Sequence, residues 1–166
     1  KSYSDAFKLL EYRYAIPEKT VITVEDLESI KDVRFYYPLE KERDLISFVV
    51  QGNSQKAKSL LNELLDENLK KRFLNKDDSR QFVFAIVSTI NRISNLIDNE
   101  PEIIFKDTNL VTTLMLSENN QLLAEHINQY FEQLVDHINQ NKEQIEKVKK
   151  DEMLDFIHNN YSIDLS

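Results

Sequence analysis

A proline and a glycine enclose an amphipathic segment in YYPLEKERDLISFVVQG, and this punctuation constrains the fold more than any other feature of the chain. Pro38 suits the first turn of a helix, where its missing N–H costs nothing. Gly52 suits the residue just past a helix end, where the backbone needs a positive φ. A helix is therefore predicted over residues 39–51. Its apolar and polar side chains take opposite sides: Leu39, Ile46, Val49 and Val50 against Glu40, Lys41, Arg43, Asp44 and Ser47.

A second helix follows at once in NSQKAKSLLNELLDEN. Asn53 or Ser54 is predicted to cap it, because such side-chain oxygens accept hydrogen bonds from the first free N–H groups of a helix. Apolar residues recur along it at helical spacing: Ala57, Leu60, Leu61, Leu64 and Leu65. A turn this short makes the two helices antiparallel neighbours, so the sequence predicts an αα-hairpin.

The composition of the chain limits the functions open to it. A chain of 166 residues, 41% of them hydrophobic, can fold as one domain that buries roughly 70% of its unfolded surface. No run approaches the roughly 20 apolar residues of a membrane span, so this segment is expected to make no membrane contact. The net charge of −8 repels nucleic-acid backbones. Because the chain has no cysteine and starts at Lys1, we expect a piece of a longer cytoplasmic protein.

The residues before the hairpin carry two kinds of pattern. Ser4 is a suitable cap for a helix over residues 5–14, which Pro17 would stop. The β-branched run TVITV, residues 20–24, could then pair with VRFYY, residues 33–37, as a small two-stranded β edge. Alternatively, both runs are extended connectors that lie on the helical core.

Helical periodicity dominates the chain after the hairpin. Asp77, Asp78 or Ser79 is predicted to cap a helix over residues 80–98, and a shorter helix follows over residues 110–116. The longer helix has a broad apolar face that comprises Phe82, Val83, Phe84, Ile86, Val87, Ile90, Ile93 and Ile97. The fold is therefore predicted to be mostly α, a helical bundle that contains the αα-hairpin.

The last third of the chain is helical over most of its length, with a break predicted near residues 140–142 or, alternatively, one unbroken helix. An apolar stripe before this point comprises Leu123, Ile127, Phe131, Leu134 and Ile138. Such a stripe fits a core-facing helix and a partner-facing one, including a homodimer contact, equally well. A looser apolar set follows: Ile145, Val148, Leu154, Phe156 and Ile157.

Residues with catalytic or cofactor chemistry are few. A single glycine, Gly52, cannot build a phosphate-binding loop, which needs several close backbone approaches. His126 and His137 lie eleven residues apart, about 16 Å along a helix, so one metal cannot bridge them. The carboxylates of EKERD (residues 40–44) and KKDEMLD (residues 149–155) alternate with basic residues, which is typical of a solvated face with local ion pairs. We expect no catalytic site, no cofactor and no metal.

Four tyrosines could play another role. Tyr12, Tyr14, Tyr36 and Tyr37 combine an aromatic body with a polar tip. They indicate either the edge of the core, with hydroxyls that reach water, or a pocket for a small ligand.

Three stretches of the chain together resemble AraC-type transcriptional regulators, in particular the YesN-like response regulators and their membrane-anchored relatives. They are DAFKLLEYRY, YYPLEKERDLISFVVQGNSQKAKSLLNELL and DEMLDFIHNNYSIDLS. The middle stretch is the most specific, through Tyr37, Pro38, Glu40, Glu42, Leu45, Ile46 and Gly52. The last resembles the first helix of the family's DNA-binding module, and no recognition helix follows it in this chain.

The resemblance implies a helical regulatory middle domain over residues 1–141, followed by a connector and the start of a helix-turn-helix module over residues 142–166. We expect a non-catalytic relay between an upstream sensor or receiver and the downstream module of a two-component or related regulator. Its partners would be the other domains of the parent regulator, with DNA contacted only through the missing module. The alternative is a helical sensor domain that binds a small molecule itself.

Overall fold

The computed structural model describes residues 3–15, 21, 23, 25, 34–72, 74–97, 99, 101–105 and 109–161. Within this part of the chain all regular structure is helical, which confirms the mostly α prediction. The elements are α1 (Tyr3–Ala15), α3 (Leu39–Val50), α4 (Ser54–Leu65), a π-helical turn η1 (Asp66–Lys71), α5 (Lys76–Leu96), α6 (Pro101–Ile104), α7 (Leu110–Met115) and α8 (Asn120–Tyr161).

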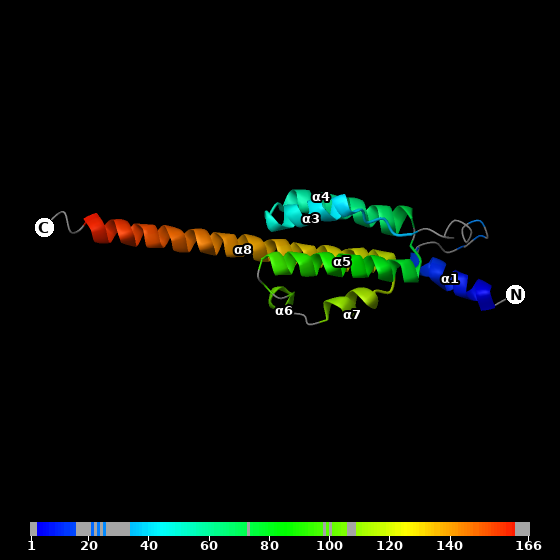
Figure 1. Cartoon of the computed structure of the whole chain (residues 1–166). Coiled ribbons are helices and arrows are strands. Elements are labelled where there is room, and N and C mark those ends of the chain that lie inside the picture. Colours follow the sequence, from blue (N-terminus) through cyan, green and yellow to red (C-terminus); the bar gives the residue numbers. More distant parts are fainter. Residues whose placement is uncertain are drawn as a thin grey trace.

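The helices form three layers (Figure 1). The α3–α4 hairpin covers one side of the central pair α5 and α8, and the short helices α6 and α7 cover the other. At one end of the bundle α8 runs far beyond its neighbours, and at the opposite end α1 projects. The two ends of the molecule are therefore linked through the central layer.

The hairpin forms as the sequence predicts. Gly52 has a φ of +69°, and its N–H donates to the carbonyl of Val49 at 2.8 Å while the next N–H donates to that of Phe48 at 2.9 Å. This pair of bonds closes the helix end in the Schellman arrangement, which requires the left-handed conformation that glycine adopts without strain. Asn53 is the cap of α4, because its side chain accepts from the N–H of Lys56 at 3.1 Å.

The predicted face of α3 is wrong by part of a turn. Its buried residues are Glu42, Leu45 and Val49, whereas Leu39 is 66% exposed. Leu39 lies about 80° around the helix axis from the centre of this buried face, at 100° per residue. The predicted apolar side left out Leu45, which is fully buried, and the charged run of residues 40–44 was interpreted as a solvated face although it contains Glu42.

Residues 34–37 form an extended connector that leads into α3, without a strand pairing among the described residues. The proposed strand partner, residues 20–24, lies mostly outside the described residues. Phe35, Tyr36 and Tyr37 pack on the core, as the connector alternative predicted. The fully buried side chain of Asn68 makes the two hydrogen bonds that a neighbouring strand would make to Tyr36. It accepts from the N–H of Tyr36 at 2.6 Å and donates to the carbonyl of Tyr36 at 2.8 Å.

Helix α5, which lies in the central layer, begins earlier than predicted. Its cap is Asn75, whose side chain accepts from the N–H of Asp78 at 2.8 Å, and not one of Asp77, Asp78 or Ser79. The apolar face from Phe82 to Ile93 is buried as expected. Phe84, which was assigned to the edge of this face, is 60% exposed.

Helix α8 is unbroken from Asn120 to Tyr161, so the predicted break near residues 140–142 is wrong and the one-helix alternative is correct. The segment around the expected break contains no proline or glycine and is rich in Lys, Glu and Gln, which are good helix formers. The change there is the loss of apolar neighbours rather than the end of the helix. The boundary predicted between residues 141 and 142 falls inside α8 and stays a prediction.

Candidate functional site

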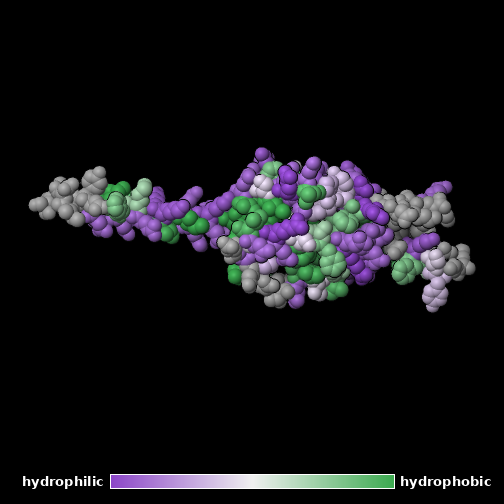
Figure 2. All heavy atoms as spheres, viewed as in Figure 1, coloured by the Kyte–Doolittle hydropathy of each residue, from purple (hydrophilic) through white to green (hydrophobic). Residues whose placement is uncertain are grey.

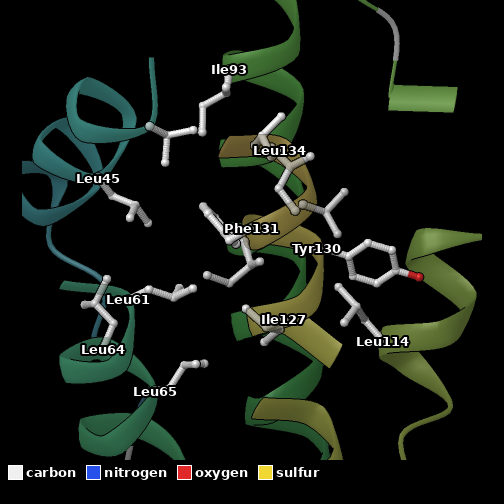
Figure 3. Close-up of a cluster of buried hydrophobic side chains, with 14 of the residues drawn as sticks. Leu45, Leu61, Leu64, Leu65, Ile93, Leu114, Ile127, Tyr130, Phe131 and Leu134 are labelled. Atoms are coloured by element: carbon white, nitrogen blue, oxygen red, sulfur yellow. The ribbon is translucent and has the colours of Figure 1, made fainter. Parts of the chain in front are cut away.

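The first half of α8 is buried in the core of this chain. The stripe that was predicted to face either the core or a partner is at most 4% exposed, and it comprises Leu123, Ile127, Phe131, Leu134 and Ile138. Figure 3 shows Phe131 and Ile127 between the α4 and α5 sides, while Tyr130 points toward Leu114 of α7. These side chains anchor α8 in the bundle, and because they are buried they present no free surface to a second copy.

Beyond Ile138 the helix leaves the core, and its apolar side chains become exposed. Six of them are between 42% and 69% exposed: Ile145, Val148, Met153, Leu154, Phe156 and Ile157. Figure 2 shows such hydrophobic side chains along the projecting helix, separated by hydrophilic ones. Exposed apolar residues that gather on one helix often mark a site of interaction with another surface.

Two contacts from the hairpin hold α8 near the point where it leaves the core. The side chain of Asn139 donates to the carbonyl of Gly52 at 3.3 Å. About two turns before it, Glu132 forms an ion pair of 2.7 Å with Lys58 of α4. The orientation of the projecting half therefore depends on how the α3–α4 turn sits on α8.

The start of α8 is held by a buried amide. The side-chain nitrogen of Asn120 lies 3.5 Å from the carbonyl of Ala15, which ends α1, and 3.4 Å from the carbonyls of Leu69 and Leu74. Its oxygen accepts from Ser79 of α5 at 3.3 Å. Two amide protons are thus shared among three carbonyls at long distances, so each bond is weak and readily exchanged.

A buried carboxylate joins α3 to α5, and the sequence analysis missed it. Glu42 is 8% exposed and accepts from Thr89 at 2.9 Å and from Arg92 at 3.0 Å. Tyr37 lies 2.8 Å from the same threonine hydroxyl. Because a carboxylate only accepts, the threonine hydroxyl donates to Glu42 and accepts a hydrogen bond from the hydroxyl of Tyr37, which gives a directed chain from the connector to α3.

The pKa of Tyr37 is raised to about 12, mainly by burial of its hydroxyl. The hydrogen bond with Thr89 lowers the pKa by a smaller amount. A sequence signal for this network existed. Glu42 lies three residues before Leu45 and seven before Val49, on the same face as these buried leucine and valine side chains.

The three described side chains of the predicted tyrosine pocket do not converge. Tyr14 is half-buried, and burial raises its pKa. It lines a cavity of about 500 Å³ between α1 and the start of α5, with Phe7 and Arg80 among its neighbours. Tyr36 instead lies under the guanidinium of Arg72, 5.3 Å from ring centre to carbon, and Tyr37 contacts Phe82 edge-on at 6.0 Å. The side chain of Tyr12 lies outside the described residues.

Two of the three histidines lie beside neighbouring polar groups. His126 lies 3.0 Å from the Ser117 hydroxyl, and His137 lies 3.0 Å from the Asn141 amide on the next turn. In the described ranges no three or more His, Cys, Asp or Glu side chains cluster as a metal site.

Comparison with known proteins shows a partial similarity to a transcriptional regulator. Over 95 residues the chain is 26% identical to the uncharacterized HTH-type transcriptional regulator YtdP of Bacillus subtilis. The chain is thus distantly similar to part of a transcriptional regulator. The matched segment is 57% of this chain and 12% of the regulator, so the chain spans a small fraction of the length of that relative. No family model and no solved structure matches the chain.

The described helices include none that is long and apolar enough to cross a membrane. The long helix α8 contacts the end of α1 at its start and the α3–α4 hairpin in its middle, and it continues outside the core. Such an arrangement can transmit a change of position from one end of the molecule to the other.

Proposed function

We propose that this chain is a non-catalytic regulatory domain of an AraC-type transcriptional regulator, and that it relays the state of an upstream sensor or receiver to a downstream DNA-binding module in the cytoplasm. The observation that carries the proposal is the continuity of α8, which runs unbroken from the core into residues that resemble the first helix of that module. The partial similarity to an HTH-type regulator supports it.

The output side of the relay is the projecting half of α8. A helix of 42 residues is about 63 Å long, and a little over half of that length follows Ile138, the last buried residue of α8. Pairs such as Glu143 with Lys147 and Glu146 with Lys150 have the i, i+4 order that stabilises an exposed helix. The exposed apolar residues near its end, such as Leu154 and Phe156, would pack against the downstream module or a second copy.

The input side is the end of α1 and the connector. An upstream change that moves Ala15 must be accommodated at the Asn120 amide, which starts α8. A change in the connector must be accommodated at Asn68 and at the chain from Tyr37 to Glu42. Either input acts only through contacts that differ between two arrangements, since a signal shifts an equilibrium no further than that difference allows.

The test uses helix phase in the parent regulator. Two alanines inserted between Glu146 and Lys147 rotate everything downstream by about 200°, whereas seven alanines rotate it by about 700°, which is close to the original phase. We expect the seven-residue insertion to keep the transcript profile of wild-type cells and the two-residue insertion to give the profile of a deletion strain.

The insertion site lies in an exposed stretch, so both variants should keep the fold of the core, which circular dichroism and the cellular protein level would check. Equal transcript profiles for the two insertions would contradict the proposal. If both behave as wild type, α8 is a passive tether, and if both behave as the deletion, phase is not what the helix transmits.

A further inference from the structure

A cavity of about 250 Å³ lies between α4 and α8, away from the tyrosines considered above. Its lining includes the apolar side chains of Ala57, Leu61, Phe131 and Val135. All four are buried, so this part of the lining belongs to the rigid core of the bundle. A cavity of this size is somewhat smaller than the roughly 300–1,000 Å³ typical of drug-sized ligands and suits a smaller molecule.

The charged groups of the lining are two carboxylates, Glu132 and Asp136, and one ammonium, Lys58. Lys58 and Glu132 form an ion pair of 2.7 Å from α4 to α8, with both side chains largely exposed. Asp136, one turn after Glu132, has no ion pair or hydrogen bond with the described residues. The side-chain oxygen of Asn128 is shielded from solvent and also lacks a partner there.

An unsatisfied shielded oxygen beside a cavity needs an explanation, because polar atoms in such positions are nearly always hydrogen-bonded. The three charged groups of the lining, Lys58, Glu132 and Asp136, sum to a formal charge of −1, in a chain whose net charge is −8. A cation fits this charge, and the Asn128 oxygen adds a further acceptor beside the cavity. An anion would meet an unpaired carboxylate and the repulsion of the whole chain.

We propose that this cavity binds a small apolar amine. The apolar body occupies the space over Leu61 and Phe131, and the ammonium group donates to the carboxylates of Asp136 and Glu132 at the rim. The exposed Lys58–Glu132 pair is weak, because exposed ion pairs gain little over hydration, so a ligand ammonium competes with it. The site is independent of the proposed relay, although a ligand there would press on the contact that holds α8.

The experiment is an NMR titration of the full chain with three probes that share one ring and differ in charge: phenethylamine, 2-phenylethanol and 3-phenylpropionate. We expect saturable amide shifts at Ala57, Leu61 and Val135 with the amine, and at least tenfold weaker binding of the alcohol and the acid. Absence of saturable shifts at these amides, or equal affinity for the three probes, would overturn the proposal.

Two substitutions of exposed residues test the charge argument in opposite directions. D136N should weaken amine binding at least fivefold, and K58M should strengthen it several-fold, because it frees Glu132. The matched control is D151N, which makes the same change on the exposed half of α8 and should leave the affinity unchanged. If D136N and D151N have the same effect, or K58M weakens binding, the assigned site is wrong. The relay would stand in either case, since its test measures transcripts of the insertion variants.

Discussion

Replacement of Gly52 by alanine tests the contact between the hairpin turn and α8. The residue has a φ of +69°, and a non-glycine residue in this left-handed region costs about 1–2 kcal/mol. An added Cβ would also overlap the side-chain oxygen of Asn139. The asparagine can rotate away, but it then loses its 3.3 Å bond to the Gly52 carbonyl, worth about 0.5–1.5 kcal/mol. Together these terms predict a loss of about 2–3 kcal/mol.

The two terms separate in a double-mutant cycle measured by urea denaturation. N139A alone should cost about 1 kcal/mol, the value of one hydrogen bond. In that background G52A no longer meets the asparagine, so it should cost only the strain of about 1–2 kcal/mol. The coupling between the two sites is therefore about 1 kcal/mol.

For a chain of this length the single variant G52A should lower Tm by about 4–12 °C. A loss below about 0.5 kcal/mol, the usual effect of an ordinary surface substitution, would refute the left-handed turn. Equal costs of G52A with and without Asn139 would refute the contact between the turn and α8.

Two further predictions follow from burial. Burial raises the pKa of Tyr37 to about 12, so the neutral hydroxyl stabilises the folded state. This contribution to the free energy of unfolding is complete below pH 10 and is lost as the pH rises from 10 through 12. The loss reaches about 2.7 kcal/mol. Urea denaturation of Y37F should lack this loss, and identical pH profiles would contradict it. Leu134 is 0% and Leu154 is 54% exposed, so L134D should abolish the folded helical signal in circular dichroism. L154D should keep the folded signal and change the free energy of unfolding by no more than about 0.5 kcal/mol. Equal effects of the two substitutions would contradict the placement of α8.

The features that the sequence predicted correctly are those that neighbouring residues decide. The turn at Gly52, the cap at Asn53 and the stripe of α4 depend on backbone conformation and spacing within a few residues. The stripe of α8 was also located correctly, but the choice between the core and a partner stayed open. Spacing shows that a face is apolar, and only the arrangement of the other helices shows whether the same chain covers it.

The errors concern residues whose role depends on distant partners. Glu42 is buried because Thr89 and Arg92 of α5, far along the chain, satisfy its carboxylate. Asn68 is buried because the connector brings the Tyr36 backbone to its amide. A carboxylate among charged neighbours and an asparagine at a helix end look like surface residues until those partners are known.

Helix α8 connects the weak contacts at one end of the molecule to a long displacement at the other. Its start is held by the shared, long hydrogen bonds of Asn120, whereas its middle is packed as far as Ile138. The remaining helix to Tyr161 measures about 35 Å at 1.5 Å per residue. A tilt of about 5° at the root would therefore move the far end by about 3 Å, which is enough to exchange one side-chain contact for another. A change at the end of α1 that re-partners the Asn120 amide could then reach the end of α8, provided that the buried stripe from Leu123 to Ile138 shifts with the helix.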